Sequence, residues 1–259
     1  MNKKLVFFDL DGTLLNSEKK IPQTTKDAIK QLRENGIDPV IATGRPPVLF
    51  DWIREELDLH NFVSTNGQYV QFNDEIIHEN IIEKEQLEKL VSDAKSRGHH
   101  MAFYNHETFI SNNIDHPYVI ESFNSFNDAL PTLDEEFHLN EKVHQAILFC
   151  TSEEEDYYRE NYPEFDFIRW HPYALDVLPK GGSKASGIRA LLEKLNVSTE
   201  NTYAFGDGLN DVAMFELVQN GIAMDNAHDD LKKVASHITK NCDEDGILCG
   251  LKHYKLLGE

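Results

Sequence analysis

Short apolar runs alternate with amphipathic stretches near the start of the chain. Residues 5–8 are a compact apolar run, the pattern of a strand that is buried on both faces. Residues 22–35 carry three apolar side chains at helical spacing, and Gly36 follows them where a helix would be capped. The chain therefore begins with a predicted strand and a predicted amphipathic helix.

The alternation continues on both sides of the middle of the chain. Residues 39–42 and Phe62–Ser64 are predicted strands, Pro46 suits the first turn of a helix between them, and 69–72 with 75–78 form a predicted hairpin. In the C-terminal part a helix, a strand, a helix and a strand are predicted at 183–195, 202–205, 210–218 and 221–224. This order predicts an α/β fold with a doubly wound, Rossmann-like parallel sheet.

The middle of the chain has a different pattern. It predicts two helices, at 83–97 and 152–161, and five strands, at 101–104, 108–111, 143–149, 165–170 and 175–178. We interpret residues 82–178 as an α+β domain inserted into a core made of residues 1–81 and 179–259. Seven of the twelve histidines lie in this insertion, but no two have HxH or HxxxH spacing, so we expect scattered, solvated histidines and no second metal site.

Composition narrows the possible partners. Hydrophobic residues make up 40% of the 259, which is enough for a packed core. The formal charge of −20 repels nucleic-acid phosphates, so we expect no nucleic-acid partner. No run is long enough to span a membrane or to form a secretion signal, and three cysteines lack CxxC spacing. These features predict a soluble cytoplasmic protein with reduced thiols; the oligomeric state stays open.

Four separated segments carry the candidate chemistry, and the first is Asp9-Leu10-Asp11-Gly12-Thr13. In an extended backbone Asp9 and Asp11 point to the same side, so two carboxylates meet at one edge. One can act as nucleophile and metal ligand while the other holds a proton, because their environments can separate their roles. A strand that simply ends in a turn is the alternative.

The second and third segments offer groups that bind anions. Thr43 and Gly44 stand between a strand and a helix, where a hydroxyl and an amide favour a phosphate, although an ordinary helix cap is the alternative. Lys184 stands at a helix start, an unfavourable place for a cation unless it neutralises a phosphate; a solvated lysine is the alternative.

The fourth segment is Gly206-Asp207-Gly208-Leu209-Asn210-Asp211. Asp207 suits a Mg²⁺ ligand, Asn210 can bond a phosphate oxygen, and Asp211 can ligate the metal or orient its waters. A simple Asx turn is the alternative. Together the four segments supply a nucleophile, a proton donor, an oxyanion-binding hydroxyl, a cation and a metal site.

At these motifs the chain resembles the haloacid dehalogenase superfamily, and within it the Cof-type phosphatases. Lesser matches are Ser64-Thr65-Asn66-Gly67 and Asp245-Gly246-Ile247, and Gln68 stands where many relatives have a small residue. The resemblance implies a hydrolase with a large α/β cap between the Thr43 and Lys184 motifs.

The resemblance also implies roles for individual residues. Asp9 would be the nucleophile that forms an aspartyl-phosphate, and Asp11 the general acid and base. Mg²⁺ would be held by Asp9, the backbone carbonyl of Asp11 and Asp207, and Asp211 stays a candidate ligand from the fourth segment, either directly or through water. Phosphate would contact the following residues: Leu10, Thr43, Gly44, Lys184 and Asn210.

The substrate is expected to be a small phosphorylated metabolite, such as a sugar phosphate or a phosphorylated cofactor. Arg45, Arg169 and His171 are candidate contacts to its leaving group, although a half-buried strand edge is the commoner explanation for the last two. Two other functions stay open: a phosphomutase or phosphotransferase on the same fold, and a receiver-like signalling protein that holds phosphate on an aspartate.

Overall fold

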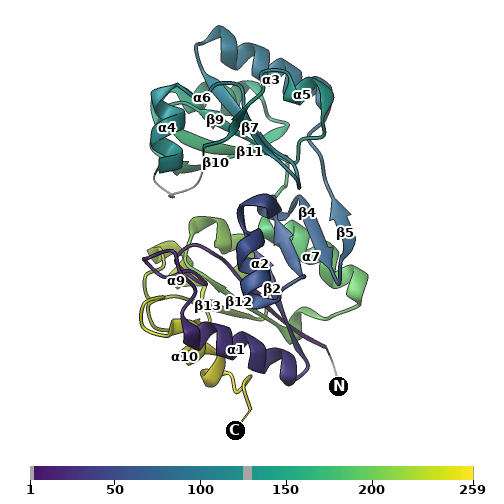
Figure 1. Ribbon diagram of the computed structural model, residues 1–259, viewed down its shortest axis with the longest axis vertical. Helices are drawn as coiled ribbons and strands as arrows, with labels where there is room; N and C mark the ends of the chain where they lie inside the picture. The colour runs from purple at the N-terminus through teal and green to yellow at the C-terminus, as the bar shows by residue number, and fades with distance from the viewer. Residues whose placement is uncertain (1–2, 125–129, 259) are drawn as a thin grey trace. The chain divides into compact units, whose positions relative to one another are not determined.

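The structure, a computed structural model, describes residues 3–124 and 130–258, which form two compact units (Figure 1). The core unit comprises the described parts of 1–44, 50–78 and 183–259, and the inserted unit comprises those of 45–49 and 79–182. The insertion expected at 82–178 thus begins three residues earlier (79 against 82) and ends four later (182 against 178). The inserted unit also includes residues 45–49, because Leu49 packs against a buried apolar cluster of that unit.

An eight-stranded sheet forms the centre of the core unit, in the order β14-β13-β12-β1-β2-β3-β4-β5. The strands from β14 to β3 pair in parallel, and β4 pairs antiparallel with β3. The strand bounds are β1 Lys4–Phe8, β2 Ile37–Ala42, β3 Phe62–Ser64, β4 Tyr69–Phe72, β5 Glu75–Glu79, β12 Thr202–Gly206, β13 Asn220–Ala223 and β14 His237–Ile238.

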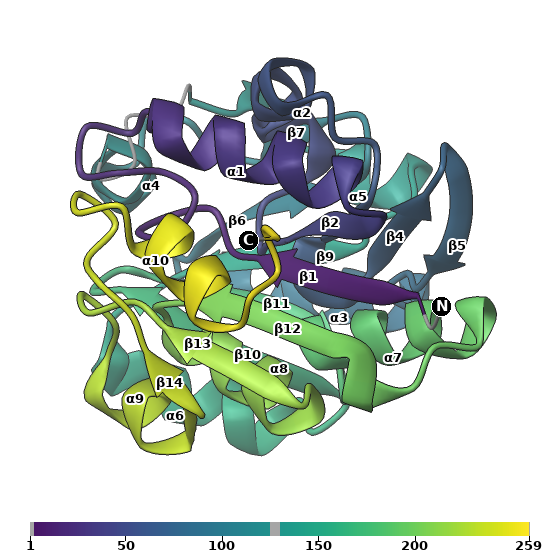
Figure 2. The same ribbon diagram turned by 90° about the horizontal axis from the view of Figure 1, so that it is seen from below.

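Helices cover both faces of this sheet (Figure 2). Strand β1 sends Val6 and Phe8 into the cluster under α1, α2 and α10, and sends Leu5 and Phe7 into the cluster under α7 and α8, because successive side chains of a strand point to opposite faces. The helix bounds are α1 Gln23–Glu34, α2 Asp51–Leu57, α7 Lys184–Leu195, α8 Val212–Leu217, α9 Asp229–Val234 and α10 Gly246–His253, with 3-10 turns η2 Thr65–Gly67, η3 Thr199–Asn201 and η4 Leu209–Asp211.

The inserted unit has its own six-stranded sheet, in the order β10-β11-β9-β6-β7-β8. Its paired strands are antiparallel except for β7 and β8. The element bounds are η1 Pro47–Leu49, α3 Lys84–Ser96, β6 His100–Tyr104, β7 Phe109–Ser111, α4 Pro117–Asn124, β8 Thr132–Leu133, α5 Phe137–Asn140, β9 Gln145–Phe149, α6 Ser152–Asn161, β10 Phe165–His171 and β11 Ala174–Pro179.

The strands and helices that the apolar pattern predicted are all present, with some bounds changed. The helix expected from Pro46 begins only at Asp51, after a 3-10 turn. The one expected over 210–218 is divided into η4 and α8. Several short elements carry too little periodicity to be predicted: α4, α5, β8, α9, β14 and α10.

The expectation that the histidines of the insertion are all solvated is wrong. His99, His138 and His144 are buried, with exposed fractions of 9%, 8% and 0%. The sequence did not show this, because long-range packing decides which polar side chains a small domain buries.

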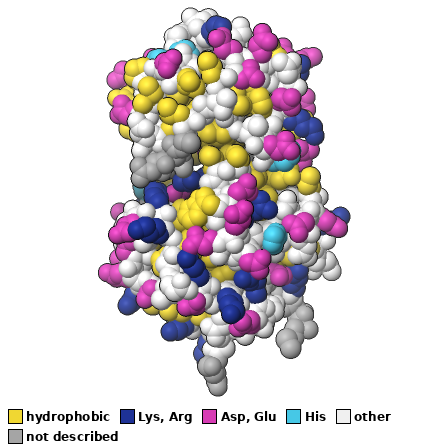
Figure 3. Space-filling view, viewed as in Figure 1, with side chains coloured by type: hydrophobic (Ala, Val, Ile, Leu, Met, Phe, Trp, Pro, Cys, Tyr) yellow, Lys and Arg dark blue, Asp and Glu magenta, His cyan; other side chains and the backbone are white. Residues whose placement is uncertain are grey.

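Acidic side chains are spread over the visible face of each unit, with basic ones among them (Figure 3). This dispersion fits the formal charge of −20. The three cysteines are free thiols, of which Cys150 and Cys242 are buried. In the part of the chain that the structure describes, no helix has both the length and the apolar character to cross a membrane.

A close contact between two glycines fixes where α7 begins relative to the turn after β3. A Cβ added at Gly187 would lie 2.7 Å from the Cα and 2.8 Å from the carbonyl oxygen of Gly67. Gly67 itself has φ +90°, a conformation that favours glycine. The contact places Lys184, in the first turn of α7, beside the Thr65–Gly67 turn.

We predict that Gly187→Ala destabilises the protein, by about 1–3 kcal/mol. In an exposed helix a Gly→Ala change instead stabilises the folded protein by about 1 kcal/mol. A loss of stability would therefore indicate the close backbone contact at Gly187. Urea unfolding measures it, with Glu193→Ala, an exposed position on the same helix, as the control. A more stable Gly187→Ala variant would contradict the close packing.

Candidate active site

Each of three neighbouring strands of the core sheet is followed directly by a residue that the sequence predicted for the active site. Strand β1 lies between β2 and β12 in parallel register, with Phe8 opposite Ile41 and Phe205. Asp9, Thr43 and Asp207 follow these strands directly. The carboxyl ends of parallel strands meet at one edge of a sheet, which is where such folds bind ligands.

A buried ammonium group joins two of the acids. The Nζ of Lys184 donates to the Oδ1 of Asp9 at 2.5 Å and to the Oδ1 of Asp211 at 2.6 Å. Lys184 and Asp211 are fully buried and Asp9 is 8% exposed. A charge so deeply buried must be paired, so the fold commits this lysine to the two carboxylates and not to solvent.

The third acid, Asp207, lies in the loop after β12. The Oδ2 of Asp211 accepts hydrogen bonds from the amides of Asp207 and Gly208, both at 3.0 Å, which closes the loop on itself. The hydroxyl of Thr13 donates to the Oδ1 of Asp207 at 3.1 Å, and this bond joins the loop to the turn after β1.

Glycine is required where these two turns meet. A Cβ at Gly12, whose φ is +71°, would lie 2.3 Å from the Oδ2 of Asp207. A Cβ at Gly206 would lie 2.5 Å from the Oδ2 of Asp211. Both distances are well inside van der Waals contact, so the glycines of the two motifs let the carboxylates approach the backbone.

Asp9, Asp207 and Asp211 together form a group suited to a divalent cation. One carboxylate oxygen of each lies within 4.8 Å of the others. When all three acids are ionised, their negative charges and the one positive charge of Lys184 leave a net charge of −2 in a largely buried place. An all-oxygen donor set with this charge fits Mg²⁺, which prefers carboxylate and water ligands.

The pKa shifts reflect the same crowding. Burial, with Asp211 as the second cause, raises the pKa of Asp207 to about 7. Burial also raises the pKa of Asp9, although Lys184 opposes the rise. Burial lowers the pKa of Lys184, but the carboxylates of Asp211 and Asp9 more than offset this and raise it overall. The ammonium therefore keeps its charge.

Asp11 lies apart from this carboxylate group. Its side chain pairs with Lys19, whose Nζ is 2.8 Å from the Oδ1 of Asp11. The three carboxylates that cluster among the described residues do not include it, so any metal contact of Asp11 would come through its backbone, as the resemblance implied. Sequence reasoning missed Lys19, because it lies in a loop with no motif of its own.

The expected phosphate contacts lie around a buried asparagine. Thr43 is 2% exposed, and its carbonyl oxygen accepts from the amide of Asn66 at 3.1 Å. A Cβ at Gly44 would lie 3.0 Å from the Nδ2 of Asn66. The Nδ2 of Asn210 donates to the Oδ1 of Asn66 at 3.5 Å. Asn66 thus lies beside three of the expected contacts: Thr43, Gly44 and Asn210. The motif Ser64–Gly67 pointed to this segment, but not to this role.

Leu10 and the cap candidates have other surroundings. The side chain of Leu10 is fully buried in the core, so only its backbone could meet a phosphate. Arg45 belongs to the inserted unit. The Arg169 guanidinium pairs with Glu155 and donates to the carbonyls of Cys150, His171 and Pro172. These bonds hold the strand end together.

His171 is bonded in the same strand end. Its Nδ1 lies 3.1 Å from the hydroxyl of Ser122 and accepts from the amide of Tyr173 at 3.3 Å. Burial lowers the pKa of His171, so the ring is neutral near pH 7. A neutral ring that is bonded within its own unit offers little charge to a substrate.

Known proteins match this chain along nearly its whole length. The family model of the haloacid dehalogenase-like hydrolases matches residues 6–251. A Bacillus subtilis protein named "Putative phosphatase YkrA" is 42% identical over 257 residues, which are 99% of this chain and 100% of that protein.

Solved structures agree with this assignment. A protein from Geobacillus kaustophilus is 44% identical with a TM-score of 0.92, over 98% of this chain and 99% of that one. The subclass IIB sugar phosphatase BT4131 is 29% identical with a TM-score of 0.85, over 98% of this chain and 100% of that one. The motifs, the fold and these matches together establish that the chain belongs to the haloacid dehalogenase-like hydrolases, in the Cof-type phosphatase group.

Proposed function

We propose that the protein is a Mg²⁺-dependent phosphatase that hydrolyses a small phosphorylated metabolite through an aspartyl-phosphate on Asp9. The observation that carries the proposal is the ammonium of Lys184, fixed between Asp9 and Asp211 at a carboxylate cluster of net charge −2. The similarity to a sugar phosphatase over the whole chain supports a sugar phosphate as substrate, and a phosphorylated cofactor is the second class.

Asp9 has the surroundings of a nucleophile. It directly follows a buried central strand, and its amide donates to the carbonyl of Phe205 at 3.0 Å, so its backbone is held rigidly. Lys184 lies against one carboxylate oxygen and offsets the charge that would otherwise repel a phosphate. In the first step the Asp9 oxygen forms a bond to phosphorus while the ester P–O bond breaks.

Asp11 would move the protons. In the first step it gives a proton to the departing alkoxide, and in the second it takes one from the water that attacks the aspartyl-phosphate. Phosphate then leaves with a water oxygen, and Asp9 and Asp11 return to their starting states. Lys19, which pairs with Asp11, is placed to influence both transfers.

The metal would be held by Asp9, Asp207 and the backbone carbonyl of Asp11. When bound, Mg²⁺ supplies a Lewis acid that neutralises charge on the phosphoryl oxygens. Both oxygens of Asp211 already accept hydrogen bonds, from Lys184 and from two amides. This supports a role for Asp211 in positioning Lys184 and the Asp207 loop. The phosphate contacts would be those expected from the motifs: the Leu10 amide, Thr43, Gly44, Lys184 and Asn210.

Transfer to a second metabolite instead of water is the other function open to this site. Such a phosphomutase or phosphotransferase would use the same nucleophile but need an acceptor hydroxyl. Release of inorganic phosphate without any added acceptor separates the two. A receiver that only holds phosphate would instead give a long-lived phosphoprotein and little phosphate release.

We predict that Asp9→Asn lowers phosphate release by about 10³-fold or more across a panel of sugar phosphates and phosphorylated cofactors. The amide cannot attack phosphorus, while Lys184 keeps its bond to Asp211. Phosphate release with Mg²⁺ measures turnover. Acid quenching with labelled substrate should trap phosphate on the wild-type chain only.

The matched control is Asp27→Asn, which removes an exposed carboxylate on α1 and should leave turnover unchanged. Thermal unfolding checks that both variants fold. Turnover near the wild-type level in a folded Asp9→Asn variant would eliminate Asp9 as the nucleophile.

We also predict that removing divalent cations with a chelator abolishes activity and that Mg²⁺ restores it. Asp207→Asn should raise the Mg²⁺ concentration needed for half-maximal activity by about tenfold or more, since it removes a charged ligand. Mg²⁺ should also raise the melting temperature of the wild type more than that of the variant. Full activity in the chelated protein would exclude the metal.

A further inference from the structure

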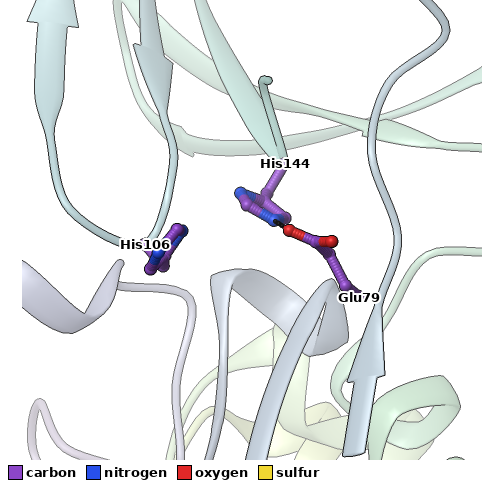
Figure 4. A group of neighbouring side chains, drawn as sticks. All are labelled: Glu79, His106 and His144. Carbon is purple, nitrogen blue, oxygen red and sulfur yellow. Dashed lines mark hydrogen bonds and ion pairs between the residues drawn. The ribbon is translucent and has the colours of Figure 1, made fainter. Parts of the chain in front are cut away.

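A second group of possible metal ligands lies within the inserted unit. Glu79, His106 and His144 each offer one ligand atom, and these atoms lie within 4.8 Å of one another (Figure 4). The three come from chain-distant segments: the end of β5, the turn between β6 and β7, and the residue before β9. None of them belongs to the motifs of the phosphatase site.

Two of the three ligand atoms are already at a separation that a metal would accept. The Nε2 of His144 and the Oε1 of Glu79 are 3.1 Å apart. Two ligands at about 2.0–2.2 Å from Zn²⁺ in tetrahedral geometry lie about 3.3 Å from each other. The pair can therefore share a metal ion with almost no rearrangement.

The second carboxylate oxygen of Glu79 is fixed by another residue. The Nζ of Lys142 donates to its Oε2 at 2.9 Å, which leaves the Oε1 turned to the imidazole. Outer partners that orient a ligand in this way are usual around metal sites. They restrict the carboxylate to one orientation.

The backbone places the two imidazoles. The amide of His144 donates to the carbonyl of Tyr104 at 2.9 Å, which holds the start of β9 against the end of β6. In the following turn the Oδ1 of Asn105 accepts from the amides of Glu107 and Thr108 at 2.9 and 2.7 Å. The turn that carries His106 is thus braced beside His144, and the ring centroids are 6.0 Å apart at 85°.

The third ligand has room to complete the set. The side chain of His106 is 36% exposed, while that of His144 is fully buried. The ligand atom of His106 already lies within 4.8 Å of those of Glu79 and His144. Because burial lowers the pKa of His144, its ring is neutral near pH 7 and can donate a lone pair.

We propose that Glu79, His106 and His144 form a binding site for a transition-metal ion such as Zn²⁺, distinct from the Mg²⁺ site of the core. Two imidazoles and one carboxylate suit Zn²⁺ and its first-row neighbours, whereas Mg²⁺ and Ca²⁺ prefer oxygen ligands alone. Three protein ligands leave a position for water, as in open zinc sites. The ion would join three segments of the inserted unit and stabilise that unit.

The test titrates Co²⁺ into full-length, chelator-treated protein in excess Mg²⁺, which fills the core site. We expect one Co²⁺ per chain with the visible absorption of a four- or five-coordinate ion, and its displacement by Zn²⁺. His106→Ala and Glu79→Gln should each weaken Co²⁺ binding tenfold or more. Both positions are accessible, so these variants avoid the buried His144.

Two controls locate the ion. His60→Ala removes an exposed imidazole that lies beside Asp58 and Asp74, and it should bind Co²⁺ like the wild type. Asp207→Asn alters the core acids and should also leave the Co²⁺ spectrum unchanged. Wild-type affinity in both His106→Ala and Glu79→Gln, or loss of binding in Asp207→Asn, would overturn the proposal. No binding by the wild type would overturn it as well and leave Glu79 and His144 as a hydrogen-bonded pair.

Discussion

The active-site architecture depends on one buried cation. Lys184 has no exposure, so its ammonium must be paired within the protein, and the fold gives it Asp9 from one end of the chain and Asp211 from the other. Removing both partners would leave an uncompensated buried charge, and a broken buried ion pair costs about 3–5 kcal/mol. The contact of Gly187 with Gly67, the closed loop after β12 and the tight turn at Gly12 all serve to hold these three groups in place.

The two carboxylates of the first motif have separate environments. Asp9 shares the lysine and a buried site, whereas Asp11 pairs with Lys19 in a more exposed loop. This separation suits two different roles on one short segment, a nucleophile and a proton carrier. It arises because β1 ends at Phe8 and the backbone turns from Leu10 onward, so the side chains of Asp9 and Asp11 meet different parts of the fold.

The apolar alternation of the sequence predicted the central strands and long helices, because burial on both faces leaves a clear pattern. Short elements such as α5 and β14 escaped prediction, since a few residues cannot show a period. Within the site, motif spacing indicated Asp9, Lys184 and Asp207, but Lys19 and the position of Asn66 depend on loop geometry that no local pattern encodes. The cluster of Glu79, His106 and His144 shows the same limit, because its members are far apart in sequence.

The order of strands in the core sheet has a consequence for how the protein folds. Strand β1 is flanked by β2, about thirty residues later, and by β12, whose residues follow after the whole inserted unit. The bond between Lys184 and Asp9 spans 175 residues. Such distant pairing is slow to form, because closing a long loop costs entropy before any contact repays it. During synthesis the β12 edge of β1 therefore stays unpaired until the last third of the chain has been made.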